Sequence, residues 1–181
     1  MRLKSVFWIL LVVTRFQVYA DDPVILQNNL YQALMTIRAD HVFSNTATKD
    51  HFVLIVSGKS VVDSKVRLSI LTHDNRQIFT DSFKASDLLY NYDNGEGLNI
   101  KQKDAIIRKR ITHFFSDSCF IYPAIKIAEP FFEDNSDKAA WLDIKSNKDA
   151  IGFVYSYGYE GTYAIAYSNK KKKAILYYSS D

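Results

Sequence analysis

The fold is decided by residues 151–178, which read IGFVYSYGYEGTYAIAYSNKKKKAILYY. Aromatic and aliphatic residues dominate this stretch, and short polar or glycine-containing segments interrupt it twice. Runs of this kind are typical of strands, and connections this short can form hairpins. We therefore expect three antiparallel strands joined by two hairpins: strands Ile151–Tyr157, Thr162–Ser168 and Ala174–Tyr178, with connections Gly158–Gly161 and Asn169–Lys173.

The first half of the chain contains a second block of strand-forming sequence, at about residues 51–83. Phe52–Val56 is a compact apolar run, and Val66–Ile70 alternates apolar with polar residues, as a strand buried on one face does. Gln77–Phe83 resumes the strand pattern after a polar turn. This block predicts a three-stranded antiparallel meander.

Helical patterns precede and separate the two blocks. Apolar residues recur every three or four positions across Pro23–Ala39, which predicts an amphipathic N-terminal helix. Lys101–Ser116 and Asp137–Lys145 predict two further helices. The expected fold class is therefore α+β: two three-stranded antiparallel β blocks (about 51–83 and 151–178) flank a central helical segment, with a helix at the N-terminus.

Residues 1–20 have the layout of a secretory signal peptide. A basic start leads into the apolar run Val6–Val13, and small or aliphatic residues precede a cleavage point after Ala20. We expect residues 21–181 to form a single α+β globular domain that is soluble, secreted or periplasmic, and without stable membrane insertion. A retained anchor is the alternative, but Arg15 interrupts the apolar run after roughly ten residues, where a spanning helix needs about 20.

The net charge of +3 comes entirely from the signal segment, where Arg2, Lys4 and Arg15 lie without an acidic residue. The remaining chain is formally neutral, which argues against nucleic acid as a partner. Cys119 is the only cysteine and cannot form an internal disulfide, so we interpret it as a small buried apolar residue.

The tyrosines of residues 151–178 fall on one face when the strands are drawn out. Tyr155 and Tyr157 share a face in the first strand, and Tyr163 and Tyr167 share one in the second, with small residues opposite. In one interpretation the aromatic face is the core and the hydroxyls reach polar partners at its rim. In the other, the small face packs on a helix and the four tyrosines form an exposed platform for a protein or glycan ligand. These four residues are the speculative ligand-binding site.

The run Lys170–Lys173 also has two interpretations. It could form a patch for anionic surfaces, or it could be a solvated hairpin turn whose charge discourages aggregation of the flanking strands. The neutrality of the chain after the signal segment favours the second interpretation.

No catalytic, metal-binding or cofactor motif stands out, so we predict no metal and no cofactor. The expected function is that of an exported binding or accessory protein of the cell envelope or extracellular space, non-catalytic, with a protein or glycan as its partner. The alternative is a small secreted hydrolase acting on envelope or extracellular substrates, for which His113 is the side chain to test.

Overall fold

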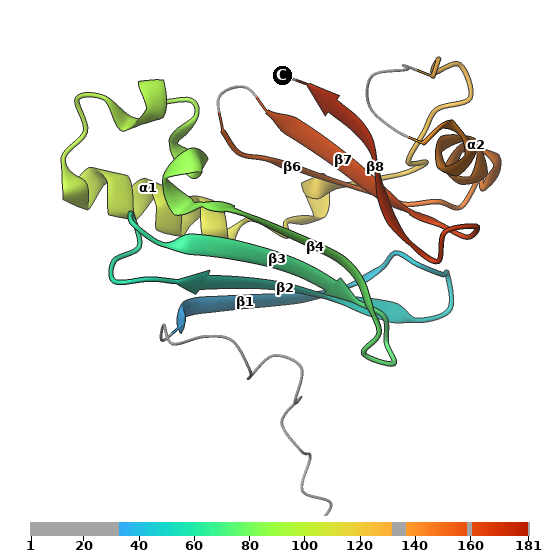
Figure 1. Cartoon of the computed structure of the whole chain (residues 1–181), viewed down its shortest axis with the longest axis horizontal. Helices are drawn as coiled ribbons and strands as arrows, with labels where there is room; N and C mark the ends of the chain where they lie inside the picture. Colours follow the sequence, from blue (N-terminus) through green and yellow to red (C-terminus); the bar gives the residue numbers. More distant parts are fainter. Residues whose placement is uncertain (1–32, 132–136, 159–160, 181) are drawn as a thin grey trace, which may run out of the picture. The chain divides into compact units, whose positions relative to one another are not determined.

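Two four-stranded antiparallel sheets make up the fold (Figure 1). The computed structural model describes residues 33–131, 137–158 and 161–180. The chain divides into Met1–Leu30, which lies outside the described residues, and Tyr31–Asp181. The first sheet has the order β1 (Ala33–Val42), β2 (Lys49–Ser57), β3 (Lys65–Leu71) and β4 (Gln77–Lys84).

The second sheet has the order β5 (Phe120–Ile121), β6 (Gly152–Ser156), β7 (Thr162–Ser168) and β8 (Lys173–Ser180). Between the sheets in sequence come the short helical turns η1 (Ala85–Leu89), η2 (Asp93–Gly95) and η3 (Asp117–Cys119), and the helix α1 (Ile100–Thr112). Helix α2 (Lys138–Ser146) precedes β6. The α+β class is confirmed, with one strand more in each block than the sequence predicted.

The helix predicted over Pro23–Ala39 is wrong where it can be compared, because the described part belongs to β1. Met35, Ile37 and Ala39 alternate with polar residues and turn toward the core. They add a fourth strand by pairing with β2, in a register that places Ile37 opposite Leu54. The rest of the predicted helix lies outside the described residues. In the second sheet the additional strand is β5, which is only two residues long.

The main core lies between the two sheets and α1. Phe52 on β2 is fully buried at its centre, where its ring contacts Phe153 on β6 at 5.3 Å and Phe120 on β5 at 5.2 Å between centroids. Helix α1 contributes Ile107 and Ile111, both fully buried. Each fully buried aliphatic or aromatic side chain adds about 1.5–3 kcal/mol of hydrophobic stabilisation. The inward faces of both sheets are therefore held against each other by large side chains.

A second, smaller core lies on the other face of β6 and β7. Trp141 and Ile144 of α2 pack there against Ala164 and Ala166 of β7. Small side chains let a helix approach a sheet closely, which is why the strand face opposite the tyrosines carries alanine. Gly152 on β6 makes room for a side chain of β8, since a Cβ there would lie 2.6 Å from the Tyr177 hydroxyl.

Both helices begin at capping residues. Asn99 accepts a hydrogen bond from the Gln102 amide at 3.0 Å, and the Gln102 side chain accepts one from the Asn99 amide at 2.9 Å. Asp137 caps α2 by accepting from the amides of Ala139 and Ala140. Neither helix, nor any other in the described ranges, is long and apolar enough to cross a membrane.

Candidate binding groove

The tyrosine face of β6 and β7 lies toward the main core. Tyr155 is 5% exposed and Tyr167 is 8% exposed, while Tyr157 and Tyr163 are half-buried. Of the two interpretations that the sequence left open, burial at these positions fits the core. A role for any of the four in ligand binding stays a prediction.

The aromatic rings of this face stack on one another. Tyr157 has Phe83 of β4 at 4.3 Å and Tyr163 of β7 at 4.6 Å between centroids, with interplanar angles of 8° and 21°. Because two rings cannot stack on the same side of a third, both faces of Tyr157 are covered. A ligand that reaches Tyr157 therefore meets the edge of its ring.

Asp81 joins the two sheets through a polar contact within this aromatic layer. The hydroxyls of Tyr155 and Tyr157 both donate to its Oδ2, at 3.0 and 3.2 Å. Burial, and then the negative charge of Asp81, raise the pKa of both tyrosines well above the usual value. The two hydroxyls consequently remain protonated donors at any physiological pH.

Asp81 was not identified from the sequence, although the sequence around it indicates a carboxylate on an apolar strand face. Phe79, Asp81 and Phe83 alternate along β4, so all three side chains lie on one face of the strand. A carboxylate between two phenylalanines at this spacing must either be buried with a partner or break the apolar face. The partners, however, come from β6, some 74 residues further along the chain.

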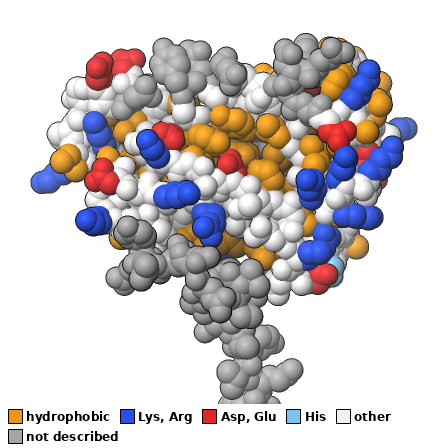
Figure 2. Space-filling model, in the orientation of Figure 1, with side chains coloured by type: hydrophobic (Ala, Val, Ile, Leu, Met, Phe, Trp, Pro, Cys, Tyr) orange, Lys and Arg blue, Asp and Glu red, His pale blue; other side chains and the backbone are white. Residues whose placement is uncertain are grey.

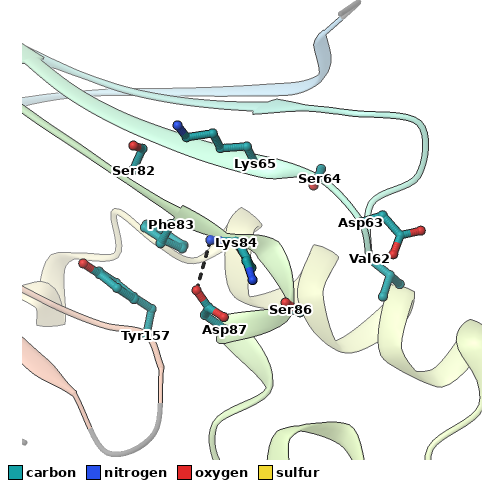
Figure 3. A pocket seen from close by; sticks show the side chains of 10 residues that line it. All are labelled: Val62, Asp63, Ser64, Lys65, Ser82, Phe83, Lys84, Ser86, Asp87 and Tyr157. Carbon is teal, nitrogen blue, oxygen red and sulfur yellow. Dashed lines mark hydrogen bonds between the residues drawn. The ribbon is translucent and has the colours of Figure 1, made fainter.

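A groove of about 710 Å³ opens beside this layer (Figure 3). Its wall is built from the loop between β2 and β3, the start of β3, the end of β4 and the turn η1, together with Tyr157, which directly follows β6. Phe83 and Tyr157 supply the aromatic part of the lining. Three hydroxyl groups also line it, those of Ser64, Ser82 and Ser86. The lining of the groove thus mixes apolar side chains with hydrogen-bonding groups.

The two aspartates of the groove accept hydrogen bonds from the protein, whereas its two lysines form no ion pair within the described residues. Asp63 accepts a hydrogen bond from the Ser60 hydroxyl at 2.8 Å, and Asp87 accepts one from the Lys84 amide at 3.0 Å. The ammonium groups of Lys65 and Lys84 are exposed and form no ion pair within the described residues. Two cationic donors in this lining are therefore open to a ligand. Figure 2 shows one face of the molecule, with apolar side chains across its middle and basic side chains on either side.

The backbone at this edge of the first sheet is already occupied. β4 is the last strand of the sheet, and the amide of Ser82 donates to the Asp81 carboxylate at 2.7 Å. Two residues further on, the amide of Lys84 donates to Asp87. These two amides cannot pair with an added strand, which is a known way to protect a sheet edge. An added strand would therefore lack two of its backbone donors at this edge.

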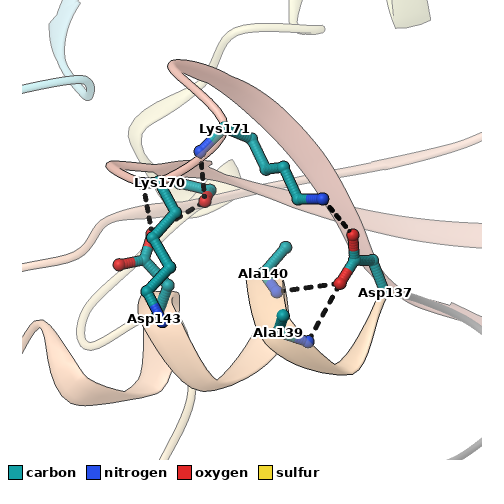
Figure 4. A network of polar contacts seen from close by, with 7 residues as sticks. Asp137, Ala139, Ala140, Asp143, Lys170 and Lys171 are labelled. Atoms are coloured by element: carbon teal, nitrogen blue, oxygen red, sulfur yellow. Dashed lines mark hydrogen bonds and ion pairs between the residues drawn. The ribbon is translucent and has the colours of Figure 1, made fainter.

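The lysine run forms the turn between β7 and β8 and is fastened to α2 (Figure 4). Lys171 Nζ lies 2.5 Å from Asp137 Oδ2, and this contact, followed by the Ala140 amide, lowers the pKa of that carboxyl group. Asp143 accepts from the Lys170 amide at 2.9 Å and from the Ser168 hydroxyl at 2.7 Å. One of the four lysines is thus paired within the protein, and the turn as a whole is anchored.

His113, the side chain to test for hydrolysis, lies near Cys119, which is half-buried. They line one cavity beside α1, but their bonds go elsewhere. His113 Nδ1 donates to the carbonyl oxygen of Lys109 at 2.8 Å, and Cys119 Sγ lies 3.3 Å from the Ser116 hydroxyl. A nucleophile hydrogen-bonded to its base is therefore not formed by this pair in the structure.

Comparison with known proteins identifies no relative: no protein-family model, no curated protein and no solved structure matches the chain.

Proposed function

We propose that this chain is an exported binding or accessory protein of the cell envelope or extracellular space, with a non-catalytic role, and that its ligand is a glycan. The observation that carries the proposal is the groove of about 710 Å³ with two uncommitted ammonium groups in its lining. Ligand sites are typically concave, largely apolar, and equipped with a few placed polar groups. Export rests on the signal-like first 20 residues.

The chemistry of the lining favours a glycan over a protein segment. A peptide bound as an added strand needs free backbone groups along a sheet edge, and the amides of Ser82 and Lys84 are occupied. The hydroxyls of a sugar both donate and accept hydrogen bonds, as the three serine hydroxyls of the groove do. Lys65 and Lys84 add donors for ring oxygens or for acidic substituents.

The test measures binding of soluble cell-wall and extracellular-matrix oligosaccharides, neutral and acidic, to residues 21–181 by calorimetry. We expect at least one oligosaccharide to bind, and we expect the double variant Lys65→Ala, Lys84→Ala to weaken its binding at least tenfold. The matched control is Lys126→Ala, which removes an exposed lysine outside the groove. The proposal fails if the panel contains no ligand, or if the double variant binds as the control does.

One observation keeps the hydrolase alternative worth testing, namely that His113, Cys119 and Ser118 line a single cavity. In many enzymes the catalytic hydrogen bonds tighten only once substrate is bound. The hydrogen bonds that these residues make without substrate therefore do not exclude a hydrolase. A panel of ester and cell-wall substrates would support hydrolysis only if His113→Gln abolished an activity that the unaltered protein shows.

A further inference from the structure

Two further cavities lie beside α1, and neither shares a lining residue with the groove. One measures about 320 Å³ and reaches from η1 to β6, and the other measures about 230 Å³ and lies against Tyr92 and Ile106. Arg110 and His113 line both. The cavities therefore meet at the last turn of α1.

The larger cavity is mainly apolar inside. Leu88 and Phe114, both buried, form part of its wall, and residues 154–156 of β6 close it on the other side. An apolar cavity of this kind gains from filling by hydrocarbon, at roughly 25 cal/mol per Å² of apolar surface removed from water. It suits an alkyl or aryl group.

The place where the cavities meet is basic. Lys109, Arg110 and His113 all line the smaller cavity, and neither cavity has an aspartate or glutamate in its lining. None of the three forms an ion pair within the described residues, whereas Arg108 on the same helix is paired with Asp104 at 2.7 Å. The basic groups at the cavities are thus uncompensated.

Arg110 is held in place before any ligand binds. Its guanidinium lies 4.1 Å from the ring centroid of Tyr90 and 5.4 Å from that of Tyr92, and one of its N–H groups donates to the Leu88 carbonyl oxygen. A guanidinium has five N–H donors in a fixed planar arrangement, so the others remain for a carboxylate or phosphate. The ring of His113 is also oriented, because its Nδ1 donates to the Lys109 carbonyl oxygen. Nε2 is then an acceptor in the neutral ring and a donor to an anion in the imidazolium.

We propose that these two cavities bind an amphiphilic anion, that is, an alkyl or aryl carboxylate or phosphate ester. Its hydrocarbon part fills the larger cavity, and its acidic group lies among Lys109, Arg110 and His113. This site is separate from the groove, with which it shares no lining residue.

The first experiment measures binding of four probes to residues 21–181 by calorimetry: octanoate, octyl phosphate, 1-octanol and inorganic phosphate. We expect the two amphiphilic anions to bind at least tenfold more tightly than either octanol or phosphate, and their ratio identifies the preferred acidic group. Shortening the chain should weaken binding by about fourfold per methylene, the equivalent of the usual hydrophobic increment. Octanoate and octyl phosphate both binding no better than octanol would overturn the proposal.

The second experiment locates the site. We expect the double variant Lys109→Ala, His113→Gln to weaken binding of the preferred anion at least tenfold. Ser118→Phe, which places a ring at an exposed position of the cavity lining, should abolish it. Arg110 is left unaltered because its stacking also supports the fold.

The controls keep the outcome independent of folding and of the groove. Lys101→Ala removes an exposed lysine from the start of α1, outside both cavities, and should bind as the unaltered protein does. The groove variant Lys65→Ala, Lys84→Ala should also retain full binding. Equal weakening in the cavity variants and in these controls, with unchanged thermal unfolding, would place the anion elsewhere and refute the assignment.

Discussion

Asp81 is the side chain whose removal tests the polar link between the two sheets. Replacing it with alanine leaves the hydroxyl of Tyr155, which is 5% exposed, without its acceptor at 3.0 Å. A buried donor without a partner costs about 2 kcal/mol. The hydroxyl of Tyr157 is half-buried and can turn to water, so its loss adds about 1 kcal/mol. We expect Asp81→Ala to lower the free energy of unfolding by about 3 kcal/mol.

A double-mutant cycle separates this link from general packing. Tyr155→Phe alone should cost about 1.5 kcal/mol, because it removes one bond to a charged acceptor without leaving a buried group unpaired. The double variant should cost about 2.5 kcal/mol rather than the 4.5 kcal/mol that additivity requires, which is a coupling of about 2 kcal/mol. Urea unfolding followed by near-ultraviolet circular dichroism of the tyrosines measures all four proteins.

The control replaces Asp87, the other carboxylate that accepts from a β4 amide. Asp87→Ala should show no coupling with Tyr155→Phe, because the Asp87 carboxylate accepts from the Lys84 amide and not from a tyrosine. The bond from the Gly158 amide goes to the backbone carbonyl of Asp87, which the alanine variant keeps. If the costs of Asp81→Ala and Tyr155→Phe add to within about 0.5 kcal/mol, the reasoning about this cross-sheet bond is refuted.

Three further predictions concern stability. Burial raises the pKa of Tyr155, Tyr157 and Tyr177 above the usual value near 10, so the folded state keeps protons that the unfolded chain loses. Stability should hold below about pH 10 and fall above it by about 1.4 kcal/mol per pH unit for each of the buried Tyr155 and Tyr177, with a smaller contribution from the half-buried Tyr157, as urea unfolding at stepped alkaline pH would show. Tyr177→Phe should leave stability unchanged or raise it by about 1 kcal/mol, since the Tyr177 hydroxyl is buried without a hydrogen-bond partner within the described residues; a loss above about 1 kcal/mol in thermal unfolding would contradict this. Gly152→Ala should cost about 2 kcal/mol or more because its Cβ would collide with that hydroxyl, and the double variant with Tyr177→Phe should recover part of the loss.

Part of the fold could be predicted because strand patterns are local. The apolar run in β2 and the alternation in β3 locate those strands without knowledge of their partners. β1 was missed because its apolar residues fit two periods at once. Met35, Ile37 and Ala39 alternate, but Ile37 also continues the series Leu30 and Leu34 at helical spacing. Pairing with β2 decides between helix and strand for these residues. Because that pairing is a tertiary contact, the local sequence does not show it.

The candidate sites could be predicted only in part, for a related reason. Alternation sorted the tyrosines correctly onto one strand face, but the covering of that face depends on the first sheet. The groove and the cavities beside α1 each combine residues from segments far apart in the sequence. Lys65, Lys84 and Arg110 look like ordinary surface charges in the sequence, and only their neighbours set them apart.

The separation of the two cores has a practical spectroscopic consequence. The protein has two tryptophans, and Trp141 is the one within the described residues, packed with Phe131 in the small core beneath α2. The stacked tyrosines lie instead in the core between the sheets. In protein that begins at residue 21, tryptophan fluorescence therefore reports the docking of α2, while tyrosine circular dichroism reports the contact between sheets. A difference between the two unfolding curves would show that α2 detaches as a unit of its own, before the sheets come apart.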